Sequence, residues 1–150
     1  MFLRNKLGVS CENDILRLEM SDLTEKRKLG NLGEDLACMF LVKRGFSITE
    51  KNYLKKWGEI DIIAQNGLKT HFIEVKSVSC ENIQGIAGRE YRPEDNLHPW
   101  KLQRLSRTIQ TYLLERRVSG ETEWQFDVIT VYIDKIRLIS KISLLENIIL

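Results

Sequence analysis

Two short stretches decide the fold of this chain: Gly58-Glu59-Ile60-Asp61-Ile62-Ile63 and His71-Phe72-Ile73-Glu74-Val75-Lys76. Both are rich in β-branched and aromatic residues, which favour strands. The segment between them contains Asn66-Gly67, a pair typical of the tight turn of a β-hairpin. The sequence therefore predicts an antiparallel hairpin with strands at residues 58–64 and 71–78.

The register of this hairpin brings carboxylates together. If the turn closes symmetrically, Asp61 lies opposite Glu74 and Glu59 lies opposite Lys76. Directly opposed residues on one face of a sheet have Cβ atoms about 4.5–5.5 Å apart, and like charges at that separation destabilise the pair. We therefore expect a hard divalent cation between Asp61 and Glu74, with Lys76 nearby on the same face.

The alternation of side chains along a strand separates charged from apolar residues. It places Glu59 and Asp61 on one face and Ile60 and Ile62 on the other; in the second strand it separates Phe72, Glu74 and Lys76 from Ile73 and Val75. Unpaired charges on a buried face cost on the order of several kcal/mol. Two interpretations stay open, a metal site and a ladder of cross-strand salt bridges in which Glu59 is the structural partner of Lys76.

Composition narrows the class of protein. A length of 150 residues suits one domain, and 43% hydrophobic with 29% charged residues is typical of a folded globular chain. We find no apolar run of transmembrane length and no signal peptide, so we expect no membrane association. The three cysteines form no Cys-x-x-Cys pair, which argues against a disulfide framework or a zinc site and favours the cytoplasm.

The order of predicted elements indicates an α/β fold. Residues 1–20 are a lead-in of uncertain structure, and residues 21–150 are expected to form a single domain. A helix should begin at Ser21 or Asp22 and end near Arg44, before Gly45; its apolar stripe is Leu29, Leu32, Leu36, Ala37 and Phe40. The remaining expectations are a strand at 46–53, the hairpin, a loop at 79–97, a helix at 100–117, strands at 124–133 and 136–139, and a helix or strand at 142–150. The order α-β-β-β-α-β predicts a mixed sheet flanked by helices.

Glu34 is a third acid of interest. It lies at the border of the apolar stripe of the first helix, close to Gly30 and Gly33. Each glycine inside a helix costs about 1 kcal/mol relative to alanine, so two of them indicate close approach of the helix backbone to another element. Such an approach would carry Glu34 toward the sheet; the alternative is a solvated helix acid.

Lys76 beside two carboxylates is typical of metal-assisted hydrolysis. In that chemistry the acids hold Mg²⁺ or Mn²⁺, the metal lowers the pKa of a water, and the lysine orients that water and neutralises charge at phosphorus. Basic residues lie among tryptophans, which favours a nucleic-acid surface, although a solvated helix face gives the same pattern. The residues concerned are Lys55, Lys56, Lys101 and Arg104, with Trp57 and Trp100. His71 and His98 have no acid or cysteine at ligand spacing, and we interpret both as structural.

Five of these features together resemble a known family, the YraN-type, endonuclease-like bacterial proteins. They are Gly33-Glu34, the run from Gly58 through Asp61 to Ala64, Phe72-Ile-Glu74-Val-Lys76, Lys101, and Phe126-Asp-Val128. That family is similar to archaeal Holliday-junction resolvases of the PD-(D/E)XK nuclease superfamily, and the resemblance covers about residues 24–135. Ile60 stands where the superfamily often has proline, and Val78 and Gln125 stand where the family usually has arginine.

The resemblance implies a restriction-endonuclease-like fold, Mg²⁺ dependence and hydrolysis of phosphodiester bonds in DNA, with branched or structured DNA as the expected substrate. By the same resemblance Asp61 and Glu74 are metal ligands, Lys76 is the catalytic lysine and Glu34 is an accessory acid. A two-fold dimer would supply one site to each strand of a junction; its interface is expected on residues 124–133 or 142–150. A binding module without turnover and a structural or adaptor protein with an acidic salt-bridge cluster are the competing hypotheses.

Overall fold

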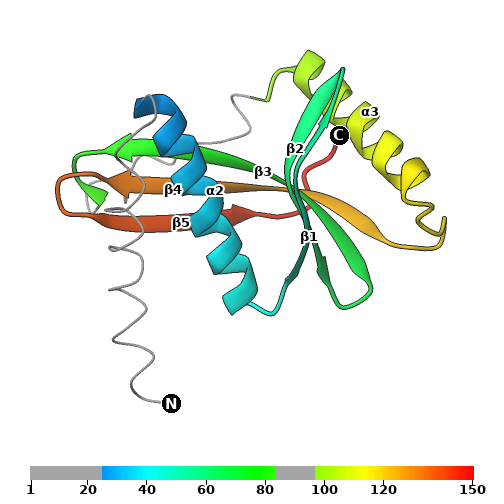
Figure 1. Cartoon of the computed structure of the whole chain (residues 1–150), viewed down its shortest axis with the longest axis horizontal. Helices are drawn as coiled ribbons and strands as arrows, with labels where there is room; N and C mark the ends of the chain where they lie inside the picture. Colours follow the sequence, from blue (N-terminus) through cyan, green and yellow to red (C-terminus); the bar gives the residue numbers. More distant parts are fainter. Residues whose placement is uncertain (1–24, 84–96) are drawn as a thin grey trace.

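Five strands and two helices follow one another in the part of the chain that the structure, a computed structural model, describes: residues 25–83 and 97–150 (Figure 1). They are α2 (Glu25–Lys43), β1 (Ser47–Lys55), β2 (Gly58–Asn66), β3 (Lys69–Cys80), α3 (Pro99–Glu115), β4 (Trp124–Asp134) and β5 (Ile139–Leu145). The strands form one sheet in the order β1-β2-β3-β4-β5, in which β3 and β4 are parallel and all other neighbours antiparallel. The fold is α/β, a mixed sheet flanked by helices, as the sequence predicted, and it is consistent with a restriction-endonuclease-like fold.

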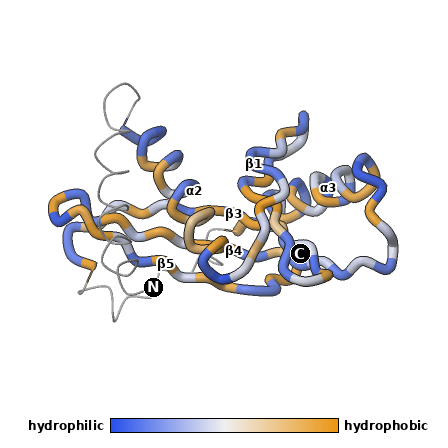
Figure 2. The backbone as a smooth tube through the Cα atoms, turned by 60° about the horizontal axis from the view of Figure 1, so that its bottom comes forward, coloured by the Kyte–Doolittle hydropathy of each residue, from blue (hydrophilic) through white to orange (hydrophobic). Residues whose placement is uncertain are grey.

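The two helices cover opposite faces of the sheet. Ile62 and Ile73 pack in the cluster beneath α2, whereas their neighbours Ile63 and Phe72 pack in the cluster beneath α3. Because successive side chains of a strand point to opposite faces, the sheet lies between two apolar layers. Figure 2 shows the matching pattern, short hydrophobic stretches along helices and strands that hydrophilic ones interrupt. Neither described helix is long and apolar enough to cross a membrane.

Helix α2 is the first predicted helix. Its buried residues Leu32, Leu36 and Ala37 belong to the expected stripe, and Leu41 joins them. The helix ends at Lys43, and Gly45 follows with a φ of 89°, a left-handed conformation that glycine adopts without a steric penalty. The proposed start at Ser21 or Asp22 and the lead-in 1–20 lie outside the described residues.

One of the two helix glycines meets the sheet closely, as expected. A Cβ on Gly33 would lie 1.7 Å from Ser77 Oγ and 2.9 Å from Ser77 Cβ, on β3. For Gly30 the expectation is wrong, since a Cβ there would meet nothing within 4 Å. Gly33 thus lets α2 approach β3 one residue away from Glu34.

This difference gives a paired stability prediction. We expect Gly33→Ala to lower the free energy of unfolding by about 1–3 kcal/mol, because the added methyl group overlaps Ser77. Gly30→Ala should raise it by about 0.5–1 kcal/mol, because alanine favours the helix and the site is open. Urea unfolding of both variants measures the two signs. A Gly33→Ala protein as stable as Gly30→Ala would contradict the close packing of α2 on β3.

The hairpin of β2 and β3 has the predicted register. Ile62 pairs with Ile73, and the pairing continues to Asn66 and Lys69, so Gly67 and Leu68 form the turn. Both strands are longer than predicted because pairing extends to the residues that flank the turn. Regular pairing ends at Ile62–Ile73, one residue before the expected Asp61–Glu74 and three before Glu59–Lys76.

One face assignment is wrong. Ile60 and Ile62 were expected on one face, yet Ile60 packs beneath α3 with Tyr53 and Ile63, and Ile62 packs beneath α2. The strict alternation fails where regular pairing with β3 has ended, although β2 still pairs with β1 there. The expectation for β3 is consistent with the structure, because Phe72 packs beneath α3 whereas Ile73 and Val75 pack beneath α2.

The end of the chain differs from the predicted boundaries. Residues 136–138 of the expected strand at 136–139 lie in the turn between β4 and β5, and β5 itself spans Ile139–Leu145. The predicted loop at 79–97 begins later, because β3 continues to Cys80; residues 84–96 lie outside the described part.

The two regions expected at a dimer interface differ in how they are placed in the sheet. Strand β4 pairs with both β3 and β5, so it offers no free edge to a second copy. In the apolar tail, Leu144 and Ile148 pack against the two internal clusters, whereas Ile149 is exposed.

Candidate active site

An open cleft of about 320 Å³ lies between the hairpin and the first turns of α3. Its lining comes from three elements: Gly58, Glu59 and Asp61 of β2, Glu74 of β3, and Trp100, Lys101, Arg104 and Leu105 of α3. The cleft therefore unites the predicted acidic pair with three aromatic or basic residues from a distant segment of the chain.

Gly58 allows the tip of the β1–β2 hairpin to lie against α3. A Cβ on Gly58 would come within 2.6 Å of Thr108 Oγ1, so a larger residue would push the tip away. Arg104 Nε donates a hydrogen bond of 2.5 Å to the backbone oxygen of Trp57 in the same tip. The guanidinium of Arg107 lies 4.2 Å from the centre of the Trp57 ring. These contacts fix the wall of the cleft.

Asp61 is held by the backbone of the neighbouring strand. Its Oδ2 accepts a hydrogen bond of 2.7 Å from the N–H of Val75, beyond the end of regular pairing. Burial and the nearby carboxylate of Glu74 raise the pKa of Asp61 from 3.8 to about 7, although the Val75 bond acts in the opposite direction. Asp61 is thus a carboxyl group whose negative charge is poorly compensated in the metal-free protein.

Glu74 is buried, with 7% of its surface exposed. Its Oε1 accepts hydrogen bonds from two ammonium groups, Lys76 Nζ at 2.9 Å and Lys101 Nζ. The expected pairing of Lys76 with Glu59 is therefore wrong: Glu59 is exposed at the cleft, and Glu74, on the same face of β3, holds Lys76.

The two lysines differ in electrostatic surroundings. Burial lowers the pKa of Lys76, but the charge of Glu74 and hydrogen bonds outweigh it, so the net pKa is raised. For Lys101 burial again lowers the pKa, and the neighbouring Lys76 adds to that effect against Glu74, so the net pKa is lowered. The two ammonium groups share the carboxylate of Glu74, and the positive charge of Lys76 disfavours the charged form of Lys101.

Glu34 lies near the cleft but does not line it. Burial raises the pKa of Glu34; a hydrogen bond from Asn52 lowers it, and the charge of Glu59 raises it. The charge of Glu34 in turn helps to raise the pKa of Asp61. The structure therefore places Glu34 within electrostatic reach of the acidic pair, on the helix that Gly33 brings close to β3.

The residues present fit a hard divalent cation. Mg²⁺ is usually bound through one or two carboxylates, with waters and substrate phosphates completing its shell. Asp61 and Glu74 supply two carboxylates at one open cleft, and a cation between them would offset the repulsion by which Glu74, together with burial, raises the pKa of Asp61. The pair thus suits Mg²⁺ or Mn²⁺ that also contacts a substrate.

A second cluster of potential ligands has a structural explanation. His71 Nδ1 lies 2.7 Å from Asp127 Oδ2, and Glu146 is close to both. Asp127 Oδ1 accepts hydrogen bonds from Gln125 Nε2 and from the backbone N–H of Asn147. These bonds satisfy Asp127 and hold the segment after β5 against β4. His71 thus has an acidic partner that sequence spacing did not reveal, while its structural interpretation agrees with these contacts.

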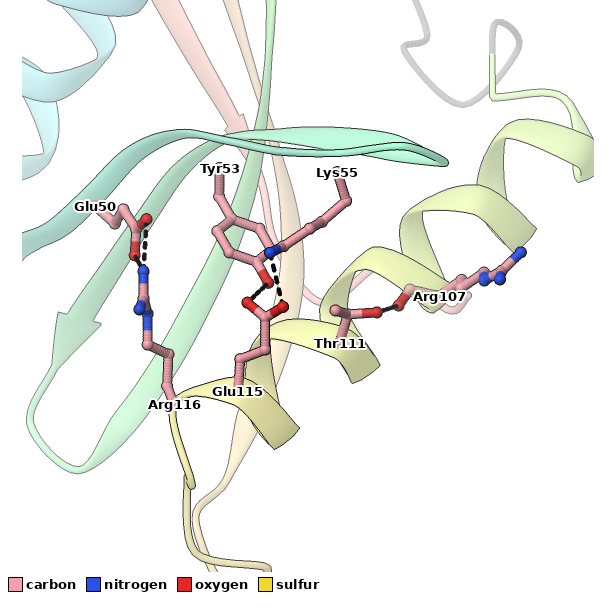
Figure 3. A network of polar contacts seen from close by, with 7 residues as sticks. All are labelled: Glu50, Tyr53, Lys55, Arg107, Thr111, Glu115 and Arg116. Atoms are coloured by element: carbon pink, nitrogen blue, oxygen red, sulfur yellow. Dashed lines mark hydrogen bonds and ion pairs between the residues drawn. The ribbon is translucent and has the colours of Figure 1, made fainter.

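The four predicted nucleic-acid contacts separate in the structure. Lys101 and Arg104 line the cleft, and Lys56 is exposed in the turn before Gly58. Lys55 instead forms an ion pair of 2.7 Å with Glu115, at the far end of α3, in the network of Figure 3. Its charge is therefore partly neutralised and lies away from the lining of the cleft.

Trp100 is a residue that sequence reasoning noted only as one member of a basic and aromatic group. It lines the cleft and 59% of its surface is exposed, whereas the Trp57 ring is covered by Arg107. The available signal was its position beside Pro99 and Lys101 at the start of a helix. That signal does not tell which element the helix start would face.

Comparisons with known proteins place the cleft residues in a shared segment. The sequence profile of the uncharacterised protein family UPF0102 matches residues 33–131. A UPF0102 protein of Campylobacter jejuni is 39% identical over 114 residues, which cover 76% of this chain and 92% of that protein. One from Helicobacter hepaticus is 39% identical over 93 residues, or 62% of this chain and 76% of the relative. One from Campylobacter fetus is 37% identical over 114 residues, with coverage of 76% and 92%.

Proposed function

This chain belongs to the UPF0102 family, and from that membership and the acidic cleft we propose that it is a Mg²⁺- or Mn²⁺-dependent DNA endonuclease. The observation that carries the proposal is the arrangement of Asp61, Glu74 and Lys76 at an open cleft. The poorly compensated charge of Asp61 favours a bound cation, and Lys76 supplies a positive charge beside it. A purely structural ladder gives no reason for a second carboxyl group, that of Asp61, at the same cleft as Glu74.

Asp61 and Glu74 would hold the metal. When bound, the metal lowers the pKa of a water and stabilises negative charge on a phosphoryl group. The Val75 N–H fixes one oxygen of Asp61, so the carboxylate is oriented before any ligand arrives. Lys76, held by Glu74, can orient the attacking water and neutralise charge on the scissile phosphate.

The rim of the cleft supports a polynucleotide substrate. Lys56 and Arg104 supply positive charge for phosphates near the acidic pair. Trp100 offers an exposed ring on which an unpaired base can stack, an interaction worth about 1–3 kcal/mol per base. An unpaired base near the scissile phosphate occurs in flaps and single strands, so we propose branched or structured DNA as substrate. We further propose a cytoplasmic location, in line with the free thiols of Cys38 and Cys80.

The direct test is cleavage of end-labelled duplex, single-strand, flap and four-way-junction DNA, with Mg²⁺, with Mn²⁺ and with excess chelator. We expect metal-dependent cleavage of at least one substrate that contains unpaired bases. Binding without cleavage on every substrate would favour the module without turnover. The absence of both DNA binding and metal binding, with metal binding measured by calorimetry, would favour the structural or adaptor protein.

A variant of Trp100 tests the substrate class on the same panel. Trp100→Ala should weaken binding to DNA with unpaired bases about tenfold and leave binding to duplex DNA within about twofold. Leu114→Ala is the matched control, because Leu114 is an exposed apolar residue of α3 that does not line the cleft. Equal losses on all substrates would argue against base stacking.

A further inference from the structure

Two ammonium groups share a single oxygen of a buried carboxylate. Lys76 Nζ and Lys101 Nζ both donate to Glu74 Oε1, and 7% of Glu74 is exposed. Lys76 follows Glu74 by two residues on the same face of β3, so the strand itself keeps Lys76 beside Glu74. Lys101 arrives from α3, a separate element, and its contact is therefore the one that can be exchanged.

A metal ion ligated by Glu74 would compete with these ammonium groups. A divalent cation and an ammonium both require the lone pairs and the negative charge of the same carboxylate. The cleft opens beside Lys101, and its lining there includes Trp100 and Arg104, which are both exposed. The long stem of lysine can move its charged end by several bonds without movement of the helix.

We infer that Lys101 is the resident cation of the metal-free cleft: metal binding displaces its ammonium from Glu74, and the freed ammonium then binds a phosphate of the DNA strand. This inference rests on the proposed function, because it assumes a metal at Asp61 and Glu74. It gives Lys101 two positions and couples the two ligands: bound metal makes a phosphate-binding charge available, and bound DNA stabilises the metal-bound arrangement.

The displacement has a measurable cost. A charge-assisted hydrogen bond to a buried carboxylate must be broken before the metal gains that oxygen. Lys101→Met keeps most of the length of the side chain and removes the ammonium, so the metal no longer has to displace it. We expect the Kd for Mn²⁺ to fall about tenfold in Lys101→Met.

Calorimetric titration with Mn²⁺ of the full chain, with folding confirmed by circular dichroism, tests the inference. Lys101→Arg keeps a cation and should bind Mn²⁺ within about twofold of the wild type. Lys69→Met is the matched control: Lys69 lies at the opposite end of β3, 3.5 Å from Glu123, and its loss should leave the affinity unchanged.

A second readout follows the freed ammonium. With Ca²⁺ in place of Mg²⁺ to suppress turnover, fluorescence anisotropy of a labelled flap DNA should show that the metal tightens binding to the wild type. That gain should be about five- to tenfold smaller in Lys101→Met, which has no ammonium to release.

The possible results separate the inference from the proposal beneath it. No Mn²⁺ binding to either the wild type or Lys101→Met would overturn both. Equal Mn²⁺ affinities in the two proteins would overturn the inference and leave the metal site standing. Weaker Mn²⁺ binding in Lys101→Met would also overturn it, because Lys101 would then support the metal rather than compete with it. If the metal tightened DNA binding as much in Lys101→Met as in the wild type, the proposed contact of Lys101 with a DNA phosphate would be overturned.

Discussion

Asp61→Asn is expected to abolish metal-dependent cleavage and, at the same time, to make the metal-free protein more stable. The amide cannot supply the negative charge that a divalent cation requires. It keeps an oxygen that can accept the N–H of Val75, and it removes the repulsion from Glu74. We expect the free energy of unfolding at pH 8 to rise by about 1–3 kcal/mol, measured by urea unfolding. Asp35→Asn, which breaks a surface pair with Lys51, is the control and should keep full cleavage.

The stabilising effect should depend on pH in a defined direction. The pKa of Asp61 is about 7 in the folded protein and near 3.8 in the unfolded chain. A raised pKa means that the folded state binds the proton more tightly, so wild-type stability is lost as pH rises from about 4 through about 7. The advantage of Asp61→Asn should therefore grow across that window and stay constant above it. An advantage that shrinks with rising pH would contradict the environment assigned to Asp61.

Glu74→Gln should also abolish cleavage, but with the opposite effect on stability. Glu74 pairs with both Lys76 and Lys101, so the amide leaves two half-buried ammonium groups without their carboxylate. We expect a loss of about 1–3 kcal/mol in the metal-free protein. Mg²⁺ should stabilise the wild type by mass action and neither variant. If the cluster were a salt-bridge ladder, both variants would be less stable and Mg²⁺ would shift none of the three proteins.

Lys76→Met is the second large expected effect. It should lower turnover by a factor on the order of 10²–10⁴, as expected for a group that handles a proton or stabilises charge in the transition state. Metal binding should persist, because Asp61 and Glu74 both keep their carboxylates at the cleft. Single-turnover cleavage and Mn²⁺ calorimetry measure the two properties separately.

Lys69→Met serves again as the control, since Lys69 lies at the other end of the same strand. Unchanged turnover in Lys76→Met on a substrate that the wild type cleaves would rule out the catalytic role. A loss of turnover that matches a loss of metal binding would assign Lys76 to support of Glu74 instead.

Asp61→Asn and Glu74→Gln should therefore change the stability of the metal-free protein in opposite directions. Both remove a negative charge from one cleft, yet the first relieves a repulsion and the second breaks two ion pairs. The sequence alone gives no reason to expect different signs, because it places the two carboxylates in equivalent, opposed positions. The contacts of Glu74 with lysines make the pair unequal, and the signs of the two stability changes test that arrangement.

The sequence by itself determined the elements and the register of the hairpin. Gly67 lies in the turn at the centre of the pairing, and the β-branched and aromatic residues on either side of it form β2 and β3. The apolar stripe and Gly45 specify helix α2 and its end. These are local constraints on backbone angles and on the sides to which neighbouring residues point, and they act within about ten to twenty residues.

The tertiary structure alone decided what meets in the cleft. Lys101 follows Glu74 by 27 positions, and only the docking of α3 on the tip that contains Gly58 brings the two together. The same holds for Asp127, which His71 contacts across parallel strands. Such contacts depend on how whole surfaces fit, through the sum of many small packing terms, and no local pattern encodes that sum. The acids could be predicted because they lie on one hairpin; the cations that oppose them could not, because one of them arrives from another layer of the fold.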